Sequence, residues 1–503
     1  MVAWLYVLWI AAFPFIPLLP NFQYGSLDAE GPRWVWLNAG IIFLLGWVAF
    51  ETLLRGRRIV VKNRLALILV VAFLCWMILT SLFGFNAEQS FWGSLFRHQG
   101  LLTYFSLGIL FFCAPLVLER WTILLPRILT LSTFILGLTV LSEVPALEYA
   151  FLRPIYAQRL LGPFGQPNFL AEYLVFLLPL HIFLLETLRG WRRVVPFCSL
   201  FLSIGIVFAT FSRTGFVGLA VVFVWWIIKM IVQKRLTIPG LLFLLGPTIL
   251  LIFLFLQFPL LEAHRARFFQ ELQPENLPAK LMTEHRGPIW SSALRLWSLR
   301  PLTGWGMENM GEVLRQRPLE RARELTPLYV DRAHSYLLDL AIGGGLPVLV
   351  LFLALLILAV KSGQIGLSSH FDSARRAFFV MSIGAFTAMS LVNIPSLSLL
   401  VILWTFLGLV SRPLAWAERS RSVSMRKRLL FVAVFSWGLL GFIFLVLRPH
   451  LAGRVFRAME QSVKTENFSA AQEHARKAVI LFPYFSVYRD YERSFVPSPP
   501  QVQ

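Results

Sequence analysis

Long apolar runs, separated by short polar loops, make up most of this chain. About 20 mostly apolar residues are needed to cross a bilayer, so each run near this length predicts a membrane-spanning helix. The runs on either side of Asn393-Ile394-Pro395 could also form one broken helix. The pattern predicts an all-α, polytopic transmembrane helical bundle of 12 or 13 spans. The spans are expected near residues 4–20, 34–54, 65–84, 101–118, 122–142, 168–187, 194–212, 214–233, 237–258, 335–360, 376–393, 395–411 and 429–447.

One long polar interruption divides these runs and extends from about residue 258 to residue 334. Because spans precede and follow it, it predicts a small folded cap on one face of the membrane, and we expect the chemistry to lie beneath this cap. The expected parts are N-terminal spans over 1–258, an extracytoplasmic helical cap loop over 259–333, C-terminal spans over 334–447 and an extracytoplasmic tail over 448–503.

The tail contains an amphipathic stretch at 470–478, followed by Leu481-Phe482-Pro483. This pattern is similar to one helix pair of a tetratricopeptide repeat. A single repeat cannot bury its own apolar face, so the pair is expected either to be a docking remnant or to pack on the cap. The Pro-rich end, 496–503, is predicted to be disordered.

Composition supports a membrane protein, since 57% of the residues are hydrophobic, 14% are charged and the mean hydropathy is +0.70. The formal net charge of +20 could suggest nucleic acid as a partner. However, Lys and Arg gather in short clusters between the apolar runs, where they orient spans and bind anionic lipid head groups. We therefore expect membrane lipids, and no nucleic acid, as partners.

The basic clusters also predict the orientation, because short loops rich in Lys and Arg stay in the cytoplasm. Every second loop carries such a cluster, which places the N-terminus inside and the cap outside. The first run has no basic segment before it and no clear cleavage site, so it is expected to be a retained span. The clusters lie near 55–64, 189–193, 229–235, 361–376 and 412–428.

No cofactor motif stands out in the sequence. The three cysteines lie inside apolar runs without metal-ligand spacing, and no Walker-type loop or Gly-x-Ser-x-Gly elbow is present. The spacing of His264, His285 and His334 matches no ligand pattern. We therefore expect neither a metal nor another cofactor. A glycine run, Gly343-Gly344-Gly345, falls inside an expected span, where small residues usually serve helix packing.

Arg213 lies in Phe211-Ser212-Arg213-Thr214-Gly215, a turn between two spans with no other charge nearby in the sequence. An arginine close to the membrane costs free energy unless it has an anionic partner, which makes it a candidate for function. The alternative is that its side chain extends to lipid head groups.

Arg286 precedes Gly287-Pro288, which is typical of a helix start. The spacing predicts Ile289, Trp290, Ala293, Leu294 and Trp297 on one face, so this helix is expected to lie on the membrane surface with that face down. Arg286 would then lie at the positive end of the helix, where phosphate oxygens are favoured. The alternative is a solvated loop arginine.

His334 lies where the cap ends and a span begins, in Arg332-Ala333-His334-Ser335-Tyr336. A histidine at this interface can accept a proton near neutral pH, as a general base must. The alternative is a capping or hydrogen-bonding residue.

Five segments together resemble the bacterial O-antigen ligase and polymerase family. Residues 161–171 look like its Gly-x-Phe-Gly-Asn-Pro-Asn entry to a span, with Gln166 in place of the first Asn, and residues 211–215 are similar to its Ser-Arg-Gly/Thr turn. Residues 286–290 and 301–306 resemble its Arg-x-x-x-Trp and Pro-Leu-x-Gly-x-Gly cap segments. Residues 333–336 resemble its Ala-His-Asn-x-Tyr/Leu motif, with Ser335 in place of Asn.

This resemblance covers about residues 155–410 and implies a GT-C-like, metal-independent, inverting glycosyltransferase of the bacterial cytoplasmic membrane, with its active site on the extracytoplasmic face. The implied donor is a glycan linked to undecaprenyl diphosphate. Arg213 and Arg286 match the family's diphosphate-binding arginines, and His334 matches its proposed base. Asn168, Gln166 and Tyr336 are candidates for supporting these residues or for contacting sugar.

The acceptor stays open at this stage. It can be lipid A core, as for a ligase, another lipid-linked glycan, as for a polymerase, or a protein, as for an oligosaccharyltransferase. A transporter or flippase of lipid-linked saccharides is the alternative from another class, and it would predict charges near mid-membrane and an internal repeat. A scaffold without catalysis is the third hypothesis.

Overall fold

The structure is a computed structural model, and it describes residues 2–19, 30–94, 97–118, 124–143, 159–232, 286–317, 330–365, 370–417, 425–483, 488–489 and 492. The expected span at 237–258, the part of the cap loop from 259 to 285 and the Pro-rich end therefore lie outside the described residues. So do His264 and His285.

The prediction of an all-α, polytopic bundle is confirmed. Within the described ranges, eight helices are long and apolar enough to cross a membrane, and four shorter apolar helices accompany them. The eight comprise α2 with η2 (Glu30–Leu54), α3 (Arg64–Leu82), α6 (Leu124–Leu141), α7 (Pro167–Thr187), η5 with α8 (Gly190–Ala209), α9 (Arg213–Val232), α15 (Tyr336–Ile365), and α18, η9 and α19 together (Met425–Lys464). The shorter ones are α1 (Val2–Ala12) with η1 (Phe13–Leu18), α5 (Leu101–Val117), α16 (His370–Ser390) and α17 (Leu397–Ser411).

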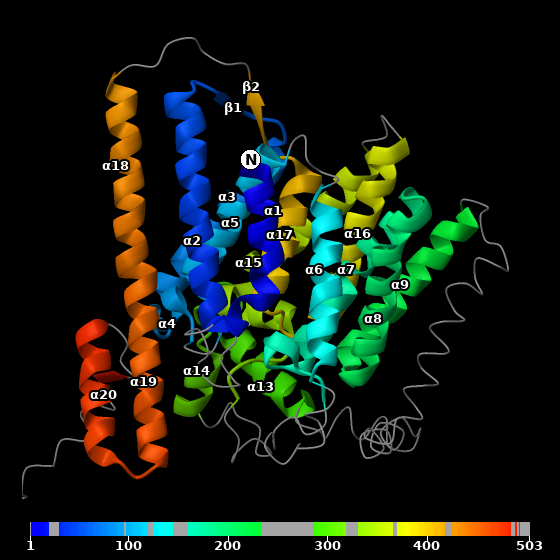
Figure 1. Ribbon diagram of the computed structural model, residues 1–503. Coiled ribbons are helices and arrows are strands. Elements are labelled where there is room, and N and C mark those ends of the chain that lie inside the picture. Colours follow the sequence, from blue (N-terminus) through cyan, green and yellow to red (C-terminus); the bar gives the residue numbers. More distant parts are fainter. Residues whose placement is uncertain are drawn as a thin grey trace, which may run out of the picture.

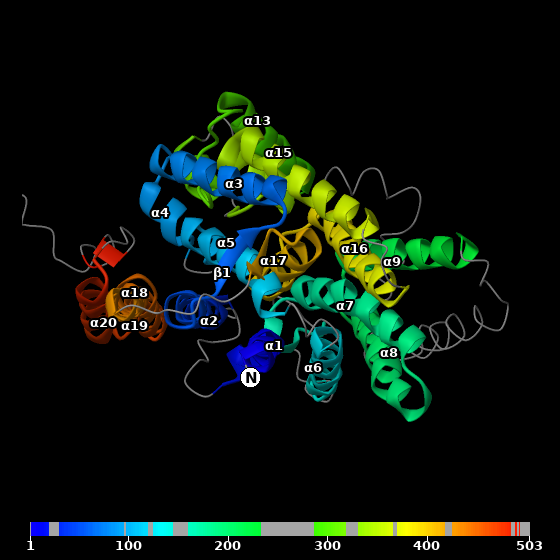
Figure 2. The same cartoon turned by 90° about the horizontal axis from the view of Figure 1, so that it is seen from above.

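Helix α17 forms the centre of the bundle, because every residue of Leu397–Ser411 is buried. Viewed from above, α5, α7, α15 and α16 surround it (Figure 2). α16 and α17 are two separate helices, and the turn at 391–396 between them contains Asn393 and Pro395. The two apolar runs therefore form two helices and not one broken helix.

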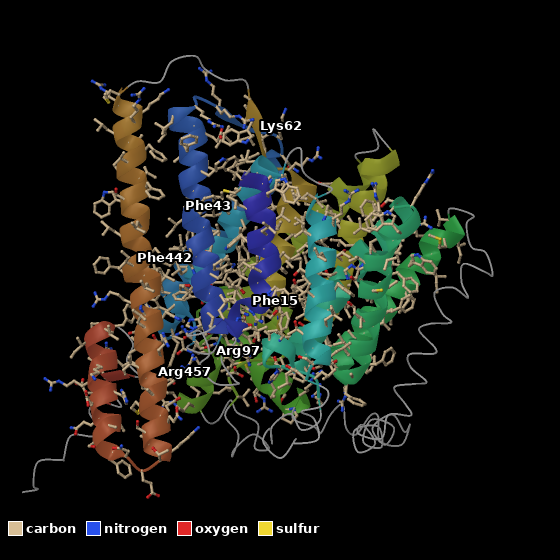
Figure 3. All side chains as sticks on the ribbon, viewed as in Figure 1. Phe15, Phe43, Lys62, Arg97, Phe442 and Arg457 are labelled. Atoms are coloured by element: carbon tan, nitrogen blue, oxygen red, sulfur yellow. The ribbon has the colours of Figure 1, made fainter. Side chains whose placement is uncertain are left out.

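The two ends of the bundle differ. At one end lies a two-stranded antiparallel ribbon of β1 (Arg58–Val61) and β2 (Leu414–Ala417), which the sequence pattern did not predict (Figure 1). At the other end lie α13 (Arg286–Leu299) and α14 (Met310–Gln316) of the cap (Figure 1). Lys62, of a predicted cytoplasmic cluster, lies at the ribbon end, whereas Arg97 lies near the cap end (Figure 3).

α15 is broken at Gly345, where φ is 71° and ψ is −179°. The span predicted at 335–360 is confirmed, and its helix is interrupted at Gly345. The break leaves helix carbonyls that accept hydrogen bonds from the cap segment at 301–306. The Trp305 and Gly306 N–H groups donate to the Ile342 and Gly343 oxygens at 2.8 and 2.9 Å. The glycine run thus permits close approach of the cap segment, and not only packing between helices.

The amphipathic face of α13 also differs from the prediction. Ile289, Ala293 and Leu296 are buried against α14 and α15, whereas Leu294 is 51% exposed. The buried face therefore packs on protein and not on the membrane surface. This explains the error at Leu294, since the protein contact covers only part of the predicted stripe.

The tail begins as a continuation of the last span, because helix runs without interruption from Met425 to Lys464. α18 (Met425–Phe442), at the edge of the bundle, has no buried residue, as expected of a lipid-facing helix (Figure 1). α19 (Arg448–Lys464) and α20 (Phe468–Leu481) form a helical hairpin. Beyond it, Phe482 meets the Trp92 ring of α4 (Ala87–Trp92) edge-on, with the ring centroids 5.0 Å apart.

Replacement of Gly345 by alanine should destabilise the protein strongly. An added Cβ would lie 2.0 Å from the Leu302 carbonyl oxygen, and the backbone conformation of Gly345 is open essentially to glycine alone. We expect Gly345→Ala to lower the free energy of unfolding by about 2 kcal/mol or more. Thermal unfolding in detergent measures this. The matched control is Gly441→Ala in α18, where no atom lies within 4 Å of the new Cβ, and equal melting of both variants would contradict the role of Gly345.

Candidate active site

Four helices begin at the motifs that the sequence analysis selected. α7 begins at Pro167, α9 at Arg213, α13 at Arg286 and α15 at Tyr336. Hydrogen bonds and electrostatic contacts link the starts of these helices. Because the N-terminus of a helix carries partial positive charge, their convergence favours an anionic ligand.

Arg213 and Arg286 lie close to each other. Burial, and the neighbouring Arg213 guanidinium, lower the pKa of Arg286, and the buried carboxylate of Glu172 opposes this change. Arg213 has no other charge nearby in the sequence, but folding brings the cap arginine close to it. Two guanidinium groups at one place can bind the oxygens of a phosphate or diphosphate.

Arg159 connects the turn before Arg213 to the start of α7. Its Nε donates to the Thr210 carbonyl at 2.7 Å, and its Nη2 donates to the Phe211 carbonyl and to Asn168 Oδ1, both at 3.4 Å. Phe211 adopts a positive φ of 48°, which is unfavourable for a side chain of this size. Arg159 thus stabilises the backbone that presents Arg213, and Asn168 takes part in this contact.

Gln166 precedes the first residue of α7, so it occupies the N-cap position. Its side chain makes no capping hydrogen bond, and within the described part of the chain its buried Oε1 has no hydrogen-bond partner. Neither a support role nor a sugar contact is established for Gln166 by this arrangement.

His334 lies in the short loop before α15, with a positive φ of 52°. Two hydrogen bonds hold Ala333, the residue before His334. The Ala333 N–H donates to Asp339 Oδ1 at 2.9 Å, and Trp290 Nε1 donates to the Ala333 carbonyl oxygen at 2.9 Å. His334 itself is only half-buried. Strained backbone of this kind persists when its surroundings fix it, and it is common at functional sites.

The electrostatic surroundings of His334 favour the neutral imidazole. Burial, together with the positive charges of Arg97, Arg286 and Arg332, lowers the pKa of His334 below its ordinary value, while Asp331 opposes this change. A neutral imidazole can accept a proton. His334 is therefore suited to general-base chemistry at neutral pH.

Tyr336 lies below His334 in the core. Its side chain is fully buried, and its hydroxyl accepts a hydrogen bond from the Tyr104 hydroxyl at 3.2 Å. Its ring meets Phe352 edge-on, with the centroids 5.6 Å apart. Because no surface of Tyr336 is exposed, a contact with sugar is not compatible with this position, and the residue supports the start of α15.

The family comparison agrees with this arrangement. Residues 198–353 match the model of the family described as O-antigen ligase, and the match includes Arg213, Arg286 and His334. This part of the chain is an O-antigen ligase domain. No curated protein matches the chain. The domain and the apolar helices together indicate an integral membrane protein of a glycan-transferring class, of the kind that acts in polysaccharide and lipopolysaccharide biosynthesis.

Several charged residues near the candidate site were not predicted from the sequence. Glu172 and Asp339 are carboxylates inside spans, a position that by itself marks a candidate for function, so this signal was present. Glu172 accepts a hydrogen bond from Asn393 Nδ2. The ion pair of Arg97 and Asp331 gave no signal, because the two residues are far apart in the sequence.

A buried ion network lies directly behind His334. Arg332 pairs with Glu308 and, at 3.5 Å, with Asp339, and its Nη2 also donates to Gln99 Oε1 at 3.2 Å. The carboxylate of Glu308 in turn accepts from the backbone N–H groups of Ser94 and Gln99. Burial acts to lower the pKa of Arg332, but Glu308 and Asp339 raise it above its ordinary value.

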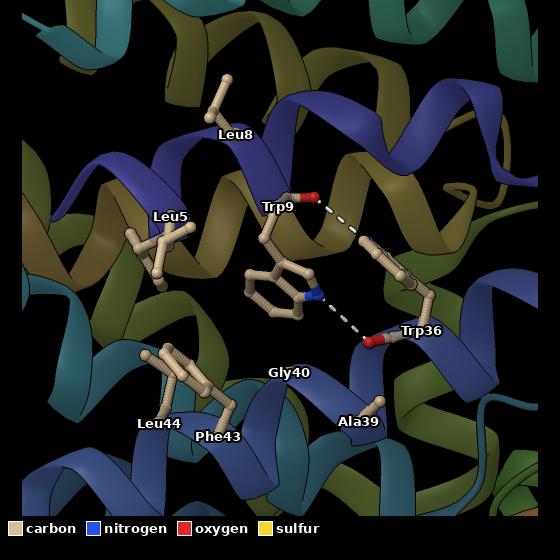
Figure 4. A pocket seen from close by; sticks show the side chains of 9 residues that line it. Leu5, Leu8, Trp9, Trp36, Ala39, Gly40, Phe43 and Leu44 are labelled. Atoms are coloured by element: carbon tan, nitrogen blue, oxygen red, sulfur yellow. Dashed lines mark hydrogen bonds between the residues drawn. The ribbon is translucent and has the colours of Figure 1, made fainter. Parts of the chain in front are cut away.

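The described residues hold no metal-binding cluster, and the groove that they form between α1 and α2 is apolar. No group of three or more His, Cys, Asp or Glu side chains there could hold a metal ion. A groove of about 430 Å³ between α1 and α2 is lined by Trp9, Trp36 and other apolar or aromatic residues (Figure 4). Its lining holds no ionisable group other than a tyrosine, so acid–base chemistry is not expected in the groove.

Removal of Glu308 should be costly, because it leaves Arg332 buried with Asp339 as its remaining anion. The side chains of Arg332 and Glu308 are only 3% and 1% exposed. We expect Glu308→Gln to lower the free energy of unfolding by about 3 kcal/mol, measured by thermal unfolding in detergent. Glu312→Gln is the control, since it removes an exposed pair with Arg315 and should change stability by about 0.5 kcal/mol or less. Similar losses in both variants would show that the network is not stabilising.

Proposed function

We propose that this chain transfers or polymerises glycan from an undecaprenyl-diphosphate-linked donor onto an acceptor hydroxyl. The reaction takes place without a metal, at the extracytoplasmic face of the bacterial cytoplasmic membrane, and inverts the anomeric centre. The observation that carries the proposal is that Arg286 lies close to both Arg213 and His334 at the cap end of the bundle.

The two arginines supply what the leaving group needs. When the bond between the anomeric carbon and the phosphate oxygen breaks, the electron pair moves to the diphosphate. Guanidinium groups bind phosphate oxygens through paired hydrogen bonds, and positive charge placed where negative charge develops lowers the barrier. Arg213 and Arg286 act electrostatically on each other across the site, and the starts of α9 and α13 add partial positive charge.

His334 supplies the base. The acceptor hydroxyl gives its proton to the neutral imidazole while its oxygen attacks the anomeric carbon from the side opposite the leaving group, which inverts the configuration. The cap helix α13 brings Arg286 close to His334. One side of the site thus binds the departing diphosphate and the other activates the acceptor.

The acceptor can be lipid A core, another lipid-linked glycan or a protein. A transporter or flippase of lipid-linked saccharides remains the alternative from another class. The candidate cations gather near one end of the bundle, which favours transfer at a membrane face over passage through the membrane.

Loss of either candidate group should abolish transfer. We expect His334→Ala and Arg213→Ala to lower transfer from purified undecaprenyl-diphosphate-linked donor by about a hundredfold or more, and EDTA to leave the wild type unchanged. The assay measures glycan product in detergent. The control is Arg315→Ala, which removes an exposed cap arginine. Undiminished transfer by both site variants would contradict the residue roles, and no transfer by the wild type with any acceptor would favour the flippase.

The pH dependence of transfer should report a neutral His334. Its pKa lies below the ordinary 6.5, so the base form persists at neutral pH and is lost only as the pH falls through that lower value. We expect kcat/KM to decline on the acid side with a midpoint below 6.5, measured at constant ionic strength. A midpoint clearly above 6.5 would mean that the surroundings do not favour the neutral form.

A further inference from the structure

We propose that Asp331 is the counter-ion of His334 in this reaction, and that Arg97 holds Asp331 in that position. The inference rests on the proposed function, in which His334 accepts a proton. Asp331 is thus a positioning residue that acts through His334. Neither Asp331 nor Arg97 belongs to the motifs that carry the family resemblance.

The first observation is the geometry of the ion pair. Nε and Nη2 of Arg97 both contact the same carboxylate oxygen of Asp331, at 3.2 Å. The Arg97 guanidinium also lies over the Phe169 ring at the start of α7, 5.6 Å from its centroid. Arg97 therefore has two contacts that fix its direction, and it limits where the Asp331 carboxylate can lie.

The second observation is that the loop between Asp331 and His334 is held at both intervening residues. Arg332 is fixed by the buried ion network, and Ala333 is fixed through its N–H group and its carbonyl oxygen. These contacts restrict the backbone that carries both Asp331 and His334, which lie three residues apart on one short loop.

The third observation is the sign of the charges around His334. Arg97 approaches from the segment before α5, Arg286 from α13 and Arg332 from the same loop, so three cations face the ring. Asp331 is the anion that acts on His334 among the described residues. Its own carboxyl stays ionised, since Arg97, Arg332 and His334 hold its pKa below the ordinary value although burial acts to raise it.

Because of these charges, the positive charge that His334 gains on accepting a proton must be compensated. The acceptor O–H bond breaks, its proton passes to the imidazole, its oxygen bonds to the anomeric carbon, and the diphosphate leaves with the electron pair. The imidazolium formed in this step faces three arginines, and the nearby carboxylate of Asp331 lowers the free energy of that cation. The cations keep His334 neutral before the reaction, and Asp331 permits it to become charged during the reaction.

The test combines two opposite charge changes with two readouts. Asp331→Asn removes the anion and should move the titration midpoint of His334 to lower pH, whereas Arg97→Gln removes a cation and should move it to higher pH. Diethyl pyrocarbonate modification of His334, followed by mass spectrometry across pH, measures the midpoint without any need for transfer. The acid limb of kcat/KM should move in the same directions, and transfer by Asp331→Asn at pH 7 should fall about tenfold or more.

The control is Glu312→Gln, which removes a carboxylate from an exposed cap pair and should leave the His334 midpoint unchanged. An unchanged midpoint in both site variants would overturn the proposal, because a purely structural role lowers stability or transfer without moving the titration. A wild type that transfers no glycan, while Asp331→Asn still moves the midpoint, would contradict the proposed reaction and support the pairing of Asp331 with His334.

Discussion

The arrangement of the site depends on the buried ion network of Arg332, Glu308 and Asp339. These residues come from three places: the loop before α15, the cap, and the first turn of α15. The carboxylate of Glu308 also accepts from the segment before α5. A buried ion pair contributes little net stability compared with an apolar contact, but it is costly to separate. Its main effect is therefore geometric, since it fixes the backbone on which His334 stands.

This constraint makes it feasible to gather so much positive charge beneath the cap. Arg97, Arg213 and Arg286 would repel one another if each were free to move. Buried or half-buried carboxylates offset part of this repulsion: Glu172 acts on Arg286, and Asp331 pairs with Arg97. In the proposed function, the diphosphate of the lipid-linked donor is the anion that matches the remaining positive charge.

Much of the fold follows from the sequence, because the length of an apolar run is a direct consequence of bilayer thickness. The local sequence pattern predicted the contacts between elements less well. The residue spacing placed Leu294 on the apolar face of α13, but the cap core covers a narrower stripe of that face. The break at Gly345 was not predicted either, because a glycine run does not reveal that the 301–306 segment binds the free carbonyls.

The site was predictable only in part, and for a similar reason. Arg213, Arg286 and His334 could be selected individually, and the resemblance to a family joined them. The pairing of Arg97 with Asp331 depends on a contact between distant segments, which no local pattern encodes.

The segment before α5 also connects the tail to the candidate site through a series of contacts. Phe482, just after α20, packs on Trp92, and the chain continues from there to Ser94, whose backbone N–H donates to Glu308. Glu308 holds Arg332, two residues before His334. One short segment therefore contacts both the residue that follows the tail hairpin and the ion network before His334. The tail lies at the edge of the bundle, but these contacts connect it to the candidate site (Figure 1).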